Sequence, residues 1–254
     1  MNILLCIDDT DDIEKGQSTG MLCQGILSMV EARGWGICKK ISRHQLLVHE
    51  DIPYTSHNSS MCFSAVIDDD RLQDIIDIAS EYLRIQHAPG SDPGLCVVNT
   101  DVLQNKQRLI DFGFSAKRIV LHKEDAYQRA SDLQVHLSEH GGTGLGVIGA
   151  LAGAGLRLSG EDGEFKGRAN VGEEGEIKTA GELRSCKNVD DVCGIDRLPV
   201  GDAVTVQIGA NTKTVLMEGK SVLLVGPCED GTAELRSCSK HELRKFDEMR
   251  CQSR

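Results

Sequence analysis

The stretch that decides the fold lies at the start of the chain, where residues 3–12 read ILLCIDDTDD. The apolar residues 3–7 favour a short buried β-strand. A polar turn follows, and residues 21–33 then carry apolar side chains at helical spacing. This order of strand, acidic loop and helix predicts a ligand-binding loop directly after a buried strand, which is where open α/β sheets place such loops.

The acidic loop is the strongest local signal of chemistry. It contains Asp8, Asp9, Asp11 and Asp12, whose carboxylates repel one another unless a cation lies among them. Hard oxygen ligands of this kind suit Mg²⁺ bound to phosphates. A solvated acidic turn is the alternative, and the D-x-D-x-D-G pattern of an EF-hand is missing from the sequence. The loop is therefore a candidate magnesium site.

A second signal is the glycine-rich stretch at residues 140–155, which reads HGGTGLGVIGALAGAG. Glycines let backbone N–H groups approach an anion, and a helix N-terminus adds a favourable dipole, so residues 141–149 form a candidate phosphate cradle. The stretch lacks the lysine of a Walker A loop. Close packing of a small-residue helix against its neighbour is the alternative interpretation.

Two weaker features each allow two interpretations. His136 and His140 stand four residues apart on an expected helix, where they either bind a metal or have a structural role. A basic group either meets phosphates or faces water, and its members are Lys39, Lys40, Arg43 and His44.

The apolar pattern predicts the other elements of an α+β fold. Strands are expected at 36–49, 61–67, 95–98 and 119–121, and helices at 70–83, 100–112 and 124–139. From about residue 165 the pattern changes to short β-rich pieces typical of a small meander or barrel. These pieces are 203–208, 212–217 and 221–225, with short helices at 179–185 and 240–248. A domain boundary is expected at 160–172.

Composition limits the class of protein. The chain has 254 residues, of which 40% are hydrophobic, so it is long enough to bury a core. The net charge of -11 lies almost entirely in residues 1–165 and disfavours non-specific binding of nucleic acid. We expect only weak binding of nucleic acid on this ground.

The cysteines and the apolar runs indicate the cellular compartment of the protein. Ten cysteines are scattered without a C-x-x-C pair, which argues against structural zinc and favours reduced thiols. No apolar run approaches the length of a signal segment or of a membrane span. The expected location is the cytoplasm, with no membrane partner.

Several motifs occur in a characteristic order. They are IDDTD at 7–11, GM at 20–21, IPYTSHN at 52–58, DPG at 92–94 and GTGLGVIGALA at 142–152. In order and approximate spacing they resemble the archaeal tRNA-isoleucine agmatinylcytidine synthetase (TiaS) family, over roughly residues 1–160. In that family an ATP-dependent kinase-like module, with an inserted ferredoxin-like domain, activates a cytidine of the tRNA anticodon by phosphorylation before agmatine attacks.

The resemblance implies an architecture and a set of site residues. The fold would be a mixed-sheet kinase-like core over 1–60 and 126–165, a ferredoxin-like insertion over 61–125, and a small C-terminal β-rich module over 166–254. Asp8, Asp9 and Asp11 would hold Mg²⁺ and take part in catalysis. The nucleotide-binding residues implied for ATP are Thr10, Gly20, Thr55, Asn58, Gly142, Thr143, Gly144 and Gly146.

The sequence also departs from the family. Cys23 stands where the family has its hydroxyl nucleophile, a threonine, and Ser18 or Thr19 could take that place only with a shift of register. The long tRNA-reading C-terminal region with its zinc ribbon is not evident. Residues 166–254 are nearly neutral and carry few aromatic side chains for base stacking.

These departures set the order of three functional interpretations. The leading one is a Mg²⁺-ATP-dependent phosphoryl-transfer or activating enzyme that acts on an unknown, small substrate. The second is the tRNA cytidine modification with agmatine, as a TiaS-like ligase. The third is a non-catalytic sensor that binds a nucleotide.

Overall fold

The protein forms two compact units in a computed structural model that describes residues 1–10, 18–52 and 58–252. Unit 1 is Met1–Ser159 and unit 2 is Gly160–Arg254. The division lies at the start of the range 160–172, in which the change of composition predicts a boundary. Helices and strands occur in both units, and parallel as well as antiparallel strand pairs are present. The fold class is therefore α+β.

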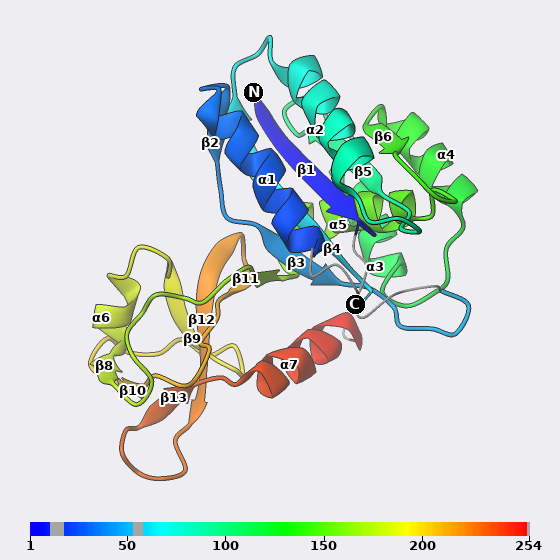
Figure 1. Ribbon diagram of the computed structural model, residues 1–254. Coiled ribbons are helices and arrows are strands. Elements are labelled where there is room, and N and C mark those ends of the chain that lie inside the picture. The colour runs from blue at the N-terminus through cyan, green and yellow to red at the C-terminus, as the bar shows by residue number, and fades with distance from the viewer. Residues whose placement is uncertain (11–17, 53–57, 253–254) are drawn as a thin grey trace. The chain divides into compact units, whose positions relative to one another are not determined.

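Unit 1 consists of one sheet covered by helices on both faces (Figure 1). Its elements are β1 (Asn2–Asp8), α1 (Thr19–Ala32), β2 (Gly36–Cys38), β3 (Ser42–Gln45), β4 (Ser59–Ile67), α2 (Leu72–Gln86), β5 (Gly94–Asn99), α3 (Lys106–Ser115), α4 (Lys123–Leu133), β6 (His136–Glu139) and α5 (Gly146–Ser159).

Strand β1 lies at the centre of this sheet. It pairs antiparallel with β4 on one side and with β5 on the other, and β6 pairs with the outer edge of β5. The short strands β2 and β3 both pair with β4. Because the segment 61–125 supplies most of β4 and all of β5, the expected ferredoxin-like insertion shares one sheet with residues 1–60.

The alternation of side chains along β1 divides the core of unit 1 into two layers. Ile3, Leu5 and Ile7 pack against α1 and α2 on one face. Leu4 and Cys6 pack against α3 and α5 on the other face. Asp8 continues the even-numbered series, so its carboxylate faces α5 at the end of the strand.

Helix α5 approaches the sheet closely because its inner face is made of glycines. A Cβ added to Gly149 would overlap the carboxylate of Asp8, and one added to Gly153 would overlap Ser60 Oγ and Cys6 Sγ. A Cβ at Gly94 of β5 would overlap the backbone of Gly146. The small residues that drew attention in the sequence therefore do serve close packing.

Several expected elements differ from those in the structure. The single strand expected at 36–49 is two short strands, and residues 119–121 form no strand. The helix expected at 100–112 begins at Lys106, where Asn105 caps it by accepting from the N–H of Arg108. The helix expected at 124–139 ends at Leu133, because Gln134 takes a left-handed conformation and the chain turns into β6.

Unit 2 is β-rich, as its sequence predicts. Its elements are β7 (Glu164–Phe165), β8 (Ile177–Thr179), α6 (Ala180–Arg184), β9 (Asp191–Gly194), β10 (Thr205–Gln207), β11 (Val215–Met217), β12 (Lys220–Pro227), β13 (Leu235–Ser237) and α7 (Lys240–Gln252). The long strand β12 pairs antiparallel with β11 and β13 and parallel with β9. Two apolar clusters lie in this unit, and α7 packs on the one that contains Leu243 and Phe246.

Among the described residues, no helix has both the length and the apolar character needed to cross a membrane.

Candidate functional site

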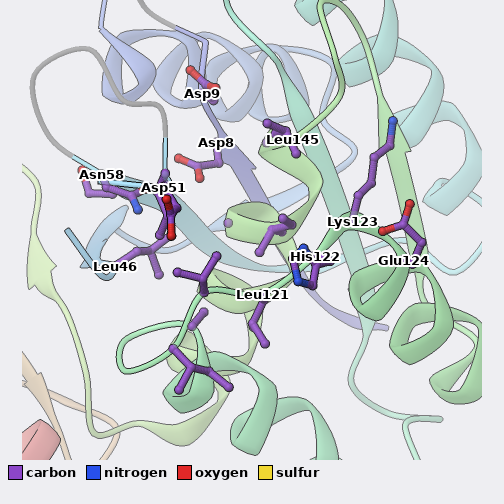
Figure 2. A pocket seen from close by; sticks show the side chains of 18 of the residues that line it. Asp8, Asp9, Leu46, Asp51, Asn58, Leu121, His122, Lys123, Glu124 and Leu145 are labelled. Carbon is purple, nitrogen blue, oxygen red and sulfur yellow. The ribbon is translucent and has the colours of Figure 1, made fainter. Parts of the chain in front are cut away.

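A pocket of about 500 Å³ lies in unit 1 at the end of β1 (Figure 2). Distant parts of the chain meet there: the end of β1, the first turns of α1 and α5, the segment before β4, and the connection from α3 to α4. Figure 2 shows Asp8 and Asp9 at one end of the pocket and Leu121 and His122 at the other. The acidic loop and the start of the small-residue helix are thus neighbours across about 140 residues of sequence.

Asp8 and Asp9 both line this pocket. Asp8 is only 7% exposed, because it is the last residue of the buried strand and lies against Gly149. Asp9 has a φ of 50°, in the left-handed region that few residues other than glycine and asparagine adopt. The chain therefore turns sharply after β1 and presents two successive carboxylates to one cavity. Asp11 and Asp12 lie outside the described residues.

The carboxylates Asp8 and Asp9 fit a magnesium ion by their chemistry. Mg²⁺ is commonly held by one or two carboxylates together with water and substrate phosphates, so two adjacent aspartates in a pocket are an adequate donor set. No group of three His, Cys, Asp or Glu side chains suited to a metal occurs within residues 1–10, 18–52 and 58–252. The magnesium site remains a prediction that rests on Asp8 and Asp9.

The other implied nucleotide-binding residues of the N-terminal region fall in different places. Asn58 lines the pocket and donates from Nδ2 to the carbonyl of Leu47 at 2.7 Å. Thr10 is fully buried just outside the pocket lining, and its carbonyl accepts from the N–H of Ala88. Gly20 is buried in the first turn of α1. Thr55 lies outside the described residues.

The glycine loop is divided between two tasks. Gly146 lines the pocket, whereas Gly142, Thr143 and Gly144 do not. The buried carboxylate of Asp92 accepts from the N–H and from the hydroxyl of Thr143, both at 2.5 Å, and the Asp92 carbonyl accepts from the N–H of Gly146. Asp92 thus occupies the position in which the sequence predicts a phosphate, and the contact of this loop with ATP remains a prediction.

Lys123 fixes the same loop from its other side. Its ammonium group forms an ion pair with Glu139 and donates to the carbonyl of Thr143 at 2.9 Å. The bond to Glu139 raises the pKa of Lys123 above its ordinary value. Figure 2 shows this amine pointing away from Asp8. Lys123 is therefore a cation of the pocket wall that supports the loop.

Part of the pocket has no counterpart in the sequence-based prediction. The connection from α3 to α4 forms an apolar wall suited to a flat ring, made of Ala116, Ile119, Val120 and Leu121. The sequence predicts a strand at 119–121, which would bury these side chains in a sheet. Only the shortness of this run argues against a strand, because three apolar residues are few for a buried strand. In the structure Ile119 is 55% exposed.

The basic group near residue 40 does not reach the pocket. Arg43 donates to Ser59 Oγ at 3.0 Å and to Gln45 Oε1 at 2.9 Å, so it ties β3 to β4. His44 is fully buried and is hydrogen-bonded to Ser42 Oγ. Neither side chain, nor Lys39 or Lys40, belongs to the pocket lining.

The family resemblance puts Cys23 at the position of the nucleophile. In the structure Cys23 lies away from the pocket, and Thr19 lies in its lining. Cys23 is fully buried in the apolar layer between α1 and the sheet, where its thiol donates to the carbonyl of Met61. Thr19 begins α1 and lines the pocket beside Asp8 and Asp9. Thr19 therefore belongs to the pocket lining, and Cys23 does not.

His136 and His140 are wrongly placed by the helical prediction. They lie on and just after β6, on the same side of the strand, and Ser138 Oγ is hydrogen-bonded to Nε2 of both rings at 2.8 and 2.9 Å. Burial lowers the pKa of both imidazoles, and His87 and His136 lower that of His140 further. Asp77 acts on His136, and Glu139 on His140, in the opposite direction.

This cluster predicts that unit 1 loses stability as the solution is acidified from about pH 7 to pH 5. A histidine whose folded-state pKa is lowered stabilises the fold above its unfolded pKa, and that contribution falls as the pH drops toward the folded value. The urea midpoint of unit 1 should therefore decrease across this range. Replacing both His136 and His140 with glutamine should flatten the decrease, whereas His241→Gln, at an exposed position of α7, should not. An equally steep decrease in the double variant contradicts the assignment.

An α+β fold with an acidic pocket at the end of its central strand is the class that these observations define. The fold matches that of TiaS. A complex of TiaS with an isoleucine tRNA and ATP has a TM-score of 0.53 and 26% identity over 61% of this chain and 36% of that chain. A tRNA fluorescent labeling enzyme has a TM-score of 0.52 and 26% identity over the same shares of both chains.

A third solved structure extends the likeness to unit 2. The complex of TiaS with the same tRNA, AMPCPP and agmatine has a TM-score of 0.53 and 20% identity over 98% of this chain and 56% of that chain. At this identity the likeness concerns the fold alone. The present chain thus matches 36% to 56% of the length of these TiaS chains. No protein-family model and no curated protein matches the sequence.

Proposed function

We propose that the chain is an ATP-using ligase that modifies tRNA. The observation that carries this proposal is the pocket at the end of β1, in which two adjacent carboxylates face an apolar wall, within a fold that matches a complex of TiaS with tRNA and ATP. Carboxylates and an apolar wall are complementary to the metal-bound phosphates and to the base of a nucleotide.

The residues of the pocket have distinct tasks in this proposal. Asp8 and Asp9 would hold Mg²⁺, which would supply positive charge to neutralise phosphate oxygens. The side chains of Ile119, Val120 and Leu121 exclude water from one side of the bound base. Thr19 presents its hydroxyl to the phosphates from the first turn of α1. Asp92 and Lys123 hold the glycine loop that leads into α5.

The solved structures that share this fold support tRNA over a small molecule as the acceptor. Net charge alone favours a small substrate over tRNA, but the structures that share this fold include TiaS complexes with an isoleucine tRNA. Net charge is a weak argument against tRNA because it averages over the surface, whereas phosphates are neutralised by local groups of cations. We therefore place tRNA modification with agmatine first, and a small-molecule acceptor second.

Transfer of labelled agmatine to tRNA tests the proposal. The full chain is incubated with ATP, Mg²⁺, bulk tRNA of the source organism and radioactive agmatine, and the acid-precipitable label is counted. We expect label in tRNA only when ATP is present. ATP turnover that ignores tRNA would restore the small-substrate interpretation, and tight ATP binding without any turnover would indicate a nucleotide sensor.

A further inference from the structure

Helix α7 of unit 2 carries a group of exposed basic side chains. They are Lys240, His241, Arg244 and Lys245, here called the α7 basic face. Residues four positions apart lie on the same side of a helix, so these side chains form two adjacent rows over the first two turns. Residues 166–254 are nearly neutral overall, and three of their 14 lysines and arginines lie together on this face.

The cations of this face are not used within the protein. In the part of the chain that the structure describes, Lys240, Arg244 and Lys245 have no hydrogen-bond or ion-pair partner. Two acids of α7 are engaged elsewhere: Glu242 binds Arg236 through two bonds of 2.8 and 2.9 Å, and Asp247 binds Arg250. The third acid, Glu248, is exposed and follows Arg244 by four residues. Unpaired cations on one face favour an anionic partner from outside.

The opposite side of α7 is buried in unit 2, which leaves the α7 basic face exposed to solvent. Leu243 and Phe246 are 4% and 3% exposed in the apolar cluster of unit 2. Arg250 donates to the carbonyl of Leu216 and lies over the Phe246 ring at 4.8 Å. The start of the helix is capped by Ser239, whose N–H and hydroxyl both donate to Glu242. The basic rows are therefore held on a rigid support.

We propose that the α7 basic face binds the phosphodiester backbone of RNA, and that this RNA is the tRNA of the proposed function, on which the inference rests. An anionic membrane is less suited, because a helix that lies on a membrane inserts an apolar face and the apolar side of α7 is buried in unit 2. Neighbouring phosphates of an RNA strand match rows of cations with little apolar contact.

A charge-reversal triple of the full chain tests the proposal: Lys240→Glu, Arg244→Glu and Lys245→Glu. The matched control reverses three other exposed cations of the same unit that lie outside α7, namely Lys166, Arg168 and Lys187. Dissociation constants for bulk tRNA are measured by filter binding between about 50 and 200 mM salt. ATP affinity is measured in parallel.

We expect the α7 triple to weaken tRNA binding by about tenfold or more, and to lower the salt slope by about two to three, since each lost phosphate contact lowers it by about one. The control should lose less, and ATP affinity should stay unchanged in both. Equal losses in the two triples, or an unchanged α7 triple, overturn the proposal while tRNA modification by the parent chain leaves the proposed function standing.

If the parent chain neither binds nor modifies tRNA, both the proposed function and the inference fall. Binding to vesicles that contain phosphatidylserine tests the alternative of an anionic membrane. Binding of the parent chain to these vesicles, lost in the α7 triple and without tRNA binding, would assign the face to a membrane surface instead.

Discussion

Replacing Asp8 with asparagine is expected to weaken ATP binding in the presence of Mg²⁺ by about tenfold or more, which corresponds to about 1.4 kcal/mol. Asparagine has nearly the same shape, so the packing against Gly149 is kept while the negative charge that attracts the metal is lost. Asp9→Asn is expected to act in the same direction. Isothermal titration with ATP and Mg²⁺ measures the effect.

The effect of Asp8→Asn on ATP affinity should change sign when Mg²⁺ is removed. Without the metal, the Asp8 carboxylate repels the triphosphate, so Asp8→Asn should bind ATP at least as well as the parent chain. Asp51→Asn is the matched control, because Asp51 also lines the pocket but is exposed and lies near His49. An equal loss with and without Mg²⁺ would contradict the role of Asp8 as a metal ligand.

Replacing Gly94 with alanine is expected to destabilise unit 1 by about 3 kcal/mol or more. The added Cβ would overlap the carbonyl group of Gly146 and the N–H of Val147, which are backbone atoms and cannot rotate away. Helix α5 would have to retreat from the sheet, and Gly149 would leave Asp8. Urea unfolding measures the loss.

Gly201→Ala is the matched control for this change. A Cβ there would meet no atom closer than 3.9 Å, and Gly201 has no positive φ. Its unfolding free energy should stay close to that of the parent chain. A Gly94→Ala variant as stable as the control would show that α5 is not held as closely as its glycines indicate.

The parts of the fold that could be predicted from sequence are those in which local pattern and burial agree. The strand after Met1 follows from a continuous apolar run, and the helix after Ser18 follows from apolar residues at helical spacing. Residues 134–139 show why other parts could not be predicted. Their composition suits a helix, but the left-handed Gln134 and the free edge of β5 turn them into β6, and these are tertiary features.

The candidate site was predictable to a similar degree. Asp8 and Asp9 stand out because clustered carboxylates after a buried strand have few structural uses. Asp92 does not stand out, since its task is to bond a loop about 50 residues away, and only the motif DPG hinted at it. The apolar wall at 119–121 was missed because a short apolar run is equally typical of a strand.

Because Asp8 packs against Gly149, the pocket can form only after both residues have been synthesised. During synthesis the ribosome makes the two carboxylates first and the glycine face of α5 about 140 residues later, a delay on the order of ten seconds at common elongation rates. Until then β1 lacks the cover of α5 on one face, and Asp8 has no glycine face against it. A nascent chain shorter than unit 1 therefore lacks the complete pocket, which forms only when α5 docks.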